Sequence, residues 1–138
     1  MLRVNKKLEY GIIALLYLHS REDKSASVRE MAEACHLPET LLSKIMQTMK
    51  GVGYVAAIHG NQGGYRLSRE LSEINLLGLT QTLVGPVMVT ECIEPGNETC
   101  PVGAHCSIMS PMHMLNQRII KLFEGTSLES LAARKVAL

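Results

Sequence analysis

The chain has 138 residues and a formal net charge of +1, which suits one domain with its own buried core. Eight Met, one Phe and no Trp exclude an aromatic-rich β-sandwich and favour packed helices. No stretch approaches the ~20 apolar residues of a membrane span and the N-terminal segment lacks a signal-peptide cleavage site, so we expect a cytoplasmic protein with no membrane partner.

Basic residues are concentrated in the first half of the chain. Residues 1–69 carry ten Lys and Arg against six acids, whereas residues 70–138 carry four against seven. A basic front half suits a polyanionic partner, although a solvated basic face explains the same charge without any partner. The charge therefore needs a motif beside it before it indicates a function.

The first helix is predicted to begin at Asn5, which can cap it, and to end near His19. Its apolar residues recur at three- and four-residue steps from Leu8 onward. Glu9 stands beside Leu8 in a helix that is otherwise predicted to be buried. It is either an exposed acid favoured near a helix N-terminus or a residue with a function.

Two short helices joined by a tight turn are predicted next. Ser27 and Glu30 match the capping box S-x-x-E that begins the first of them. Pro38 fits the first turn of the second, whose apolar residues lie at helical spacing until Gly51 and Gly53 end it. The pair describes a helix-turn-helix, which many proteins contain without binding DNA.

A hairpin is predicted directly after the helix-turn-helix. Residues 54–58 and 65–67 have the pattern of two strands, and the sequence HGNQGG at 59–64 between them tolerates positive φ. A helix-turn-helix followed by such a hairpin is the winged-helix arrangement. In that arrangement the second helix enters the major groove of double-stranded DNA, and the wing reaches the flanking backbone or minor groove.

The winged-helix geometry predicts three groups of DNA-contacting residues. Side chains near the start of the second helix would face bases and phosphates, basic side chains around it would contact phosphates, and polar side chains at the wing tip would reach the flanking DNA. The first group is Thr40, Leu41, Ser43 and Lys44, and the second is Arg29, Lys50, Arg66 and Arg69. The third group is His59, Asn61 and Gln62. Ser27, at the start of the first helix of the pair, is a further predicted DNA contact. The alternative for each is an ordinary surface residue.

Three further helices are predicted in the rest of the chain. One is capped by Asn75 and closed by Gly85, a longer one spans about 110–125, and a terminal one begins at a capping box formed by Thr126 and Glu129. The long helix has an apolar surface wide enough to pack against the domain and against another chain.

Three of the four cysteines, Cys92, Cys100 and Cys106, fall within fifteen residues of an irregular loop rich in Gly and Pro. In a cytoplasmic protein such a cluster indicates metal ligands or redox thiols rather than disulfides. Its spacing matches neither a zinc finger nor a ferredoxin. Cys35 lies on the apolar face of its helix and is expected to be packed. A zinc-stabilised module or small metalloenzyme is an alternative, but no nucleophile and base pair is evident, so we expect no enzyme.

Taken in order, LEYGIIALLYL, the helix-turn-helix ending in GYV, GGYRLSR, EINL, the three-cysteine loop and TSLESLA resemble the IscR/NsrR family of winged-helix iron-sulfur transcriptional regulators over nearly the whole chain. The resemblance implies a homodimer that pairs through the long helix and binds a palindromic operator in double-stranded DNA. It also implies an iron-sulfur cluster on the cysteine loop whose state sets the DNA affinity.

The resemblance further implies which residue completes the ligand set. IscR-like regulators place a His three residues after the third cysteine, where this chain has Met109. NsrR-like regulators sense nitric oxide through a [4Fe-4S] cluster and use an acidic residue of the partner protomer just before a Tyr of the first helix; here Glu9 precedes Tyr10. A [4Fe-4S] cluster is favoured and a [2Fe-2S] cluster stays open. The implied metal ligands are Cys92, Cys100, Cys106 and Glu9, with His105 and His113 as alternatives to Glu9.

The sequence as a whole predicts a mainly α fold with a small β-hairpin wing, that is, a winged helix-turn-helix plus a long C-terminal dimerisation helix. We expect a DNA-binding domain at 1–85, a cluster-binding loop at 86–109, and the dimerisation and terminal helices at 110–138. The predicted function is a DNA-binding transcriptional regulator, a repressor, whose operator affinity is controlled by an iron-sulfur cluster sensing nitric oxide or redox and iron status. The alternative is a cluster-free regulator of the same fold controlled by thiols or by a protein partner.

Overall fold

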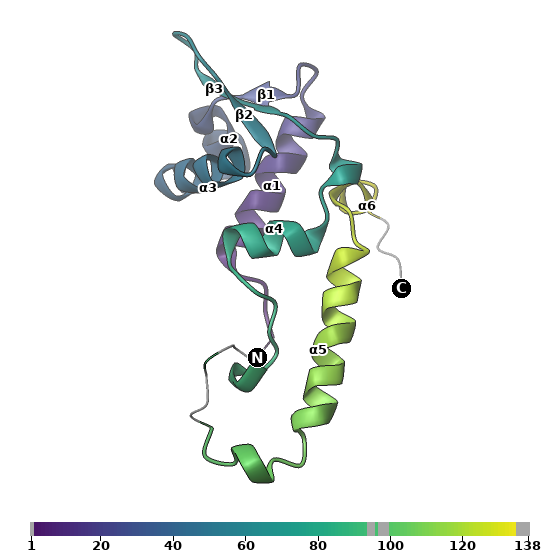
Figure 1. Cartoon of the computed structure of the whole chain (residues 1–138). Helices are drawn as coiled ribbons and strands as arrows, with labels where there is room; N and C mark the ends of the chain where they lie inside the picture. The colour runs from purple at the N-terminus through teal and green to yellow at the C-terminus, as the bar shows by residue number, and fades with distance from the viewer. Residues whose placement is uncertain (1, 94–95, 97–99, 135–138) are drawn as a thin grey trace.

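The computed structural model describes residues 2–93, 96 and 100–134; the other residues, including the middle of the predicted cysteine loop, lie outside the described part. It confirms the mainly helical fold with a small antiparallel sheet (Figure 1). The elements labelled η are short 3₁₀ turns. In chain order the elements are α1 (Lys6–Ser20), β1 (Ser25–Ala26), α2 (Val28–Cys35), α3 (Glu39–Gly51), β2 (Val55–Ile58), β3 (Gly64–Leu67), η1 (Leu71–Glu73), α4 (Leu76–Leu83), η2 (Glu91–Ile93), η3 (Gly103–His105), α5 (Met109–Glu124) and α6 (Leu128–Ala132).

The three strands form one antiparallel sheet in the order β1-β3-β2. The predicted wing is the hairpin β2–β3, in which Val55 lies opposite Leu67. The sequence did not predict β1, since two residues are too few to show an alternating pattern. A Cβ on Gly64 would collide with the carbonyl oxygen of Ala26, so the close approach of β1 to β3 requires glycine at this position.

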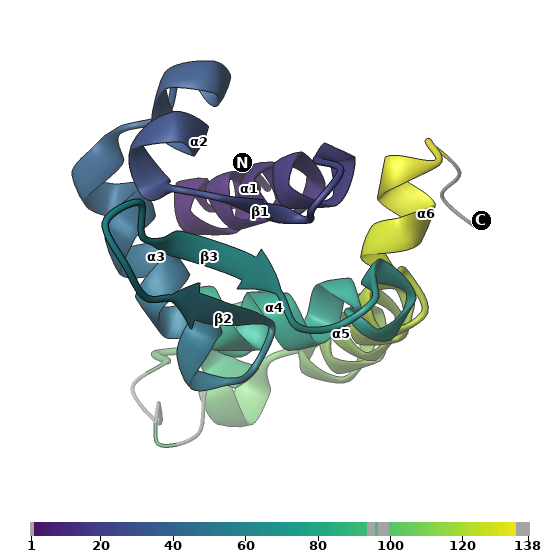
Figure 2. The ribbon, with the colours of Figure 1, turned by 90° about the horizontal axis from the view of Figure 1, so that it is seen from above.

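The hydrophobic core lies where α1, α3 and α4 pack together and against the sheet. Figure 2 shows α2 and α3 on one side of the strands and α6 on the other. α4 crosses α1 at Gly11, where any Cβ would collide with the side chain of Leu83. The largest fully buried side chains are the aliphatic and methionine residues that the composition predicts: Leu15, Leu18, Met31, Leu42, Met46, Met49, Val55, Ile74, Leu79 and Leu128.

The predicted starts of three helices are confirmed. Asn5 caps α1, Ser27 and Glu30 form the capping box of α2, and Asn75 caps α4. Pro38 was expected in the first turn of α3 but occupies its N-cap in an extended conformation. The difference is one residue, which is the usual uncertainty of a helix boundary.

The predicted capping box of the terminal helix is wrong. Ser127, not Thr126, caps α6, because its hydroxyl accepts a hydrogen bond from Ser130 N at 3.1 Å. The backbone N–H of Thr126 donates to the carbonyl oxygen of Phe123 at 3.3 Å, so this residue is still hydrogen-bonded to the last turn of α5. Two neighbouring hydroxyl residues offer equal caps in the sequence, and only the end of the preceding helix decides between them.

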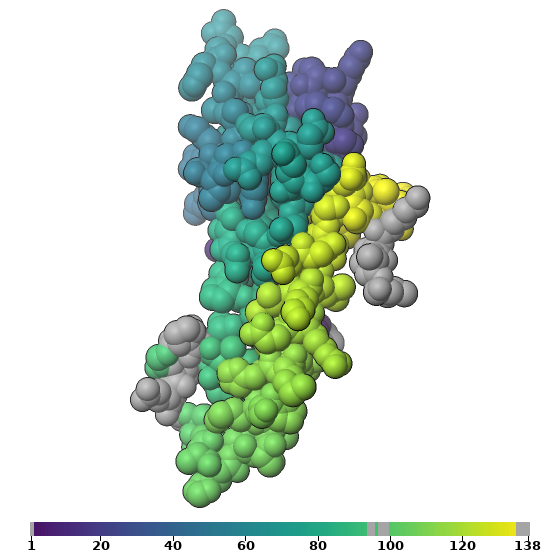
Figure 3. All heavy atoms as spheres, turned by 45° about the vertical axis from the view of Figure 1, so that its right-hand side comes forward, coloured from purple at the N-terminus to yellow at the C-terminus, as the bar shows by residue number. Residues whose placement is uncertain are grey.

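α5 extends away from the rest of the molecule, with α4 packed against part of it (Figures 1 and 3). All of α5 is described, and its one buried residue is Asn116. Met114, Leu115 and Leu122 are exposed, so the apolar surface predicted for this helix is largely uncovered within one chain. Among the described residues, every helix is too short or too polar to cross a membrane.

Candidate DNA-binding surface and cysteine pocket

α3 presents a polar face opposite its buried apolar stripe. Thr40 and Lys44 are exposed on this face, Ser43 is half-buried beside them, and Lys50 is exposed in the last turn. These side chains are accessible to a DNA groove. Leu41 is half-buried and packs against the core, so it has a structural role in addition to the base contact predicted for it.

The wing tip projects from the body of the molecule (Figure 1). His59, Asn61 and Gln62 are exposed there. Gly60 between them has a φ of +128°, a conformation that glycine adopts without strain. On β3, Arg66 is exposed whereas its neighbour Tyr65 is half-buried, so the strand points its basic side chain outward.

The wing and the start of α2 enclose a groove of about 800 Å³. The groove brings together five of the predicted DNA-binding residues, whereas the others, apart from Arg69, lie on α3 or at the hairpin tip. Arg69 lies apart from it, with its guanidinium carbon 5.7 Å from the centre of the Tyr54 ring. The five residues in the groove are Ser27, Arg29, Asn61, Gln62 and Arg66.

Arg29 is paired within the chain. Its Nε lies 3.0 Å from Oε1 of Glu33, one turn further along α2, and this carboxylate raises the pKa of the guanidinium. Both side chains are mostly exposed, so the ion pair contributes little to stability. Redirecting Arg29 to a phosphate would therefore cost little.

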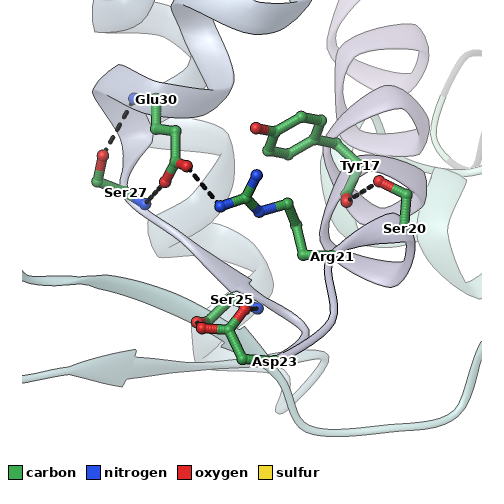
Figure 4. A network of polar contacts seen from close by, with 7 residues as sticks. All are labelled: Tyr17, Ser20, Arg21, Asp23, Ser25, Ser27 and Glu30. Atoms are coloured by element: carbon green, nitrogen blue, oxygen red, sulfur yellow. Dashed lines mark hydrogen bonds and ion pairs between the residues drawn. The ribbon is translucent and has the colours of Figure 1, made fainter.

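A polar network joins the end of α1 to the start of α2 (Figure 4). Nη2 of Arg21 lies 2.8 Å from Oε1 of Glu30, and the guanidinium carbon lies 5.8 Å from the centre of the Tyr17 ring. The same glutamate accepts a hydrogen bond from Ser27 N at 3.4 Å as part of the capping box. Sequence analysis missed Arg21, because residues nine positions apart in different elements share no periodic signal.

Cys92, Cys100 and Cys106 line one pocket of about 480 Å³. All three are free thiols, and Cys100 is exposed. Two turns fold the second arm of the loop, since Gly103 N donates to the carbonyl oxygen of Cys100 at 3.1 Å and Cys106 N to that of Gly103 at 3.3 Å. On the first arm of the loop, which runs up to Cys92, Thr90 Oγ1 lies 3.2 Å from Cys92 Sγ. The structure therefore gathers the three cysteines that the sequence singled out.

The surroundings of the three thiols are largely apolar. Within the described part of the chain, no three Cys, His, Asp or Glu residues are placed to hold one ion. The pocket walls are largely apolar, with Ile108, Met109 and Met112 among them. Cysteine thiolates are the ligands that hold iron-sulfur clusters in proteins.

The candidates for a fourth ligand lie outside this pocket. Glu9 is on α1, with Oε2 2.7 Å from Nζ of Lys6, and its side chain is 38% exposed. His105 and His113 are exposed, and neither lines the pocket. Cys35 does not line it either: it is half-buried on α2, where burial raises the pKa of its thiol.

Comparison with known proteins gives relatives over the length of the chain. Protein aau3 of Rhizobium meliloti is 27% identical over 130 residues, which cover 94% of this chain and 84% of that protein. The HTH-type transcriptional regulator NsrR of Oceanobacillus iheyensis is 25% identical over 124 residues, or 89% of this chain and 82% of the relative.

Solved structures share the fold. The chain is similar to CymR (YrzC), the global cysteine regulator of B. subtilis, with a TM-score of 0.74 and 23% identity over 98% of this chain and 99% of that one. It is also similar to T. potens IscR, with a TM-score of 0.71 and 22% identity over 96% and 88% of the two chains. The Rrf2 family model, described as "Iron-dependent Transcriptional regulator", matches residues 4–134. The chain thus belongs to the Rrf2 family and is a transcriptional regulator rather than an enzyme, as its sequence predicted.

Proposed function

We propose that the protein is a homodimeric repressor whose affinity for operator DNA is set by an iron-sulfur cluster. The ligands are Cys92, Cys100 and Cys106 of one protomer and Glu9 of its partner. The observation that carries this proposal is that the three cysteines line a single, largely apolar pocket. The family description as an iron-dependent regulator and the NsrR relatives support it.

The donor set favours a [4Fe-4S] cluster that senses nitric oxide. Thiolates are soft ligands suited to iron-sulfur clusters, and a carboxylate is a weaker ligand for the remaining iron. Met109, which lines the pocket, offers no nitrogen ligand of the kind that the IscR-like resemblance calls for. When bound, the cluster would supply an iron whose weakest ligand a diatomic gas can replace.

A connection within the chain leads from Glu9 to the DNA-binding surface. Glu9 lies near the start of α1, and Arg21, just after the end of α1, is ion-paired with Glu30 of the α2 capping box. A Glu9 that binds the partner's cluster must leave Lys6, and an exposed pair of this kind is weak enough to allow it. Loss of the cluster would free Glu9 and shift α1 and, through Arg21, the start of α2.

The proposed dimer uses the uncovered face of α5. Met114, Leu115 and Leu122 are exposed on this helix, and a second copy of the chain would cover them. Two copies related by a twofold axis would place their α3 helices in successive major grooves, about 34 Å apart, on a palindromic operator. A small change in the position of α2 and α3 would then change affinity, because half-site spacing is fixed by the DNA.

The experiment is to replace one pocket cysteine. An operator is first selected from a random duplex library with wild-type protein prepared without oxygen. Cys100→Ala is expected to abolish the visible absorption of the cluster and the cluster-dependent change in operator affinity. Its circular dichroism and thermal midpoint should match those of the wild-type protein freed of its cluster, because Cys100 is exposed.

Cys35→Ala, outside the pocket, is the matched control and should keep both the visible absorption and the cluster-dependent operator affinity. A Cys100→Ala variant regulated like the wild type would refute the proposal.

The second candidate is a regulator of the same fold that acts through its thiols without a cluster. The exposure of Cys100 and the fold shared with CymR, a global cysteine regulator by name, favour it. On this alternative the purified protein is free of iron, and operator affinity changes with thiol oxidation or with a partner protein. Iron content separates the two candidates, and zinc without operator affinity would indicate a zinc-stabilised module.

A further inference from the structure

α5 buries an amide where a helix usually buries apolar side chains. Asn116 is 3% exposed and is the one buried residue of this helix, which is described along its whole length. A buried amide is costly unless its polar atoms are hydrogen-bonded. Oδ1 of Asn116 accepts a hydrogen bond from Val89 N at 3.0 Å, across 27 positions in the sequence.

Both residues that form this hydrogen bond lie close in sequence to residues that line the cysteine pocket. Val89 is three residues before Cys92, and Thr90 and Glu91 between them line the pocket. Asn116 follows Met112, another lining residue, by four positions on α5. The bond therefore joins the first arm of the cysteine loop to the helix that forms one wall of the pocket.

The first arm of the loop has no regular structure before its last turn. Residues 85–90 have no helix or strand, and among the described residues the backbone N–H groups of Val87, Met88 and Thr90 make no hydrogen bond to the backbone of another element. The backbone N–H of Val89 donates instead to a side chain, at Oδ1 of Asn116. Removing it would leave the N–H of Val89 unpaired in a partly buried position.

We propose that Asn116 is a positioning residue for the cysteine pocket. By holding Val89 it keeps Cys92 in the pocket that Cys100 and Cys106 line, so that the three thiols are arranged before they bind a cluster. This inference rests on the proposed function for the identity of the bound group. The contact itself belongs to the chain and can be tested without any cluster.

The test compares Asn116→Leu, Asn116→Asp and Gln117→Leu. Leucine keeps the size of asparagine but has no acceptor, aspartate keeps the acceptor oxygen, and Gln117 is the exposed neighbour on the same helix. In protein freed of its cluster, hydrogen exchange of the Val89 amide should be roughly tenfold faster in Asn116→Leu, as expected for one lost hydrogen bond. Asn116→Asp and Gln117→Leu should exchange at the wild-type rate. Asn116→Ala, which also lacks the acceptor, serves if the leucine variant does not fold.

The second readout is the rate at which the reconstituted cluster is lost to a chelator without oxygen. Asn116→Leu should lose it several-fold faster than Gln117→Leu, and Asn116→Asp should restore the wild-type rate. Unchanged Val89 exchange, or a wild-type loss rate in Asn116→Leu, would overturn the inference. A wild-type protein that takes up no cluster would refute the proposed function instead, and Val89 exchange alone would then decide whether Asn116 holds the arm.

Discussion

The winged-helix body and the extension formed by α5 and the cysteine pocket are held together in different ways. The body has a core of fully buried aliphatic and methionine side chains from α1 to α4, the sheet and α6. α5 instead buries a single asparagine and exposes Leu115 and Leu122. The body is therefore specified by its own packing, whereas we propose that the extension also needs a second copy of the chain and a cluster.

The largest effect on stability is expected inside the body. Met46 is fully buried between α3 and the rest of the core. Met46→Ala should lower the free energy of unfolding by about 2–5 kcal/mol, because it removes buried apolar atoms and leaves a cavity. Urea denaturation measures this, with the exposed neighbour change Gln47→Ala as control. A loss of less than 1 kcal/mol, on the order of a surface substitution, would show that the body is not held by this core.

A substitution on α5, in the extension, is expected to have a smaller effect on folding and a large effect on assembly. Leu122 is 49% exposed in the single chain, so Leu122→Glu should change the stability of a protomer by no more than about 0.5 kcal/mol. It should raise the dissociation constant of the proposed dimer by roughly tenfold or more, since it places a carboxylate in an apolar interface. Analytical ultracentrifugation measures this, with Gln47→Glu on α3 as control. Equal self-association in both variants would place the interface elsewhere.

The smallest effect on folding is expected at the exposed face of α3. Lys44→Ala should leave stability within about 0.5 kcal/mol of the wild type, because the side chain is exposed. We expect it to weaken DNA binding similarly across sequences and to reduce the slope of affinity against salt concentration by about one phosphate contact. Fluorescence anisotropy at several salt concentrations measures both, with the α5 change Lys121→Ala as control. An unchanged slope would remove Lys44 from the DNA contacts.

Most of the body could be predicted from the sequence because its signals are local. Asn5, Ser27 and Asn75 cap helices through hydrogen bonds to residues two or three positions away, and such spacing is visible in the sequence. β1 was missed because it is too short for a pattern. The cap of α6 was placed one residue early, because Thr126 and Ser127 are both hydroxyl residues.

The cysteines of the candidate site could be picked out from the sequence, but the contacts between structural elements around the site could not. Sequence spacing singled out Cys92, Cys100 and Cys106, and the structure places them on one pocket. The two contacts that we propose hold or connect the site, Arg21 with Glu30 and Asn116 with Val89, join different structural elements. Such contacts depend on how the elements pack, and a single sequence carries no local signal for them.

Metal analysis of anaerobically purified protein tests whether the three cysteines hold an iron-sulfur cluster. Iron, sulfide and visible absorption would be measured before and after addition of a nitric oxide donor. We expect about four irons and four sulfides per chain and a spectrum that changes with nitric oxide. A protein that contains no iron or sulfide, and that still binds its selected operator in a thiol-dependent manner, would contradict it.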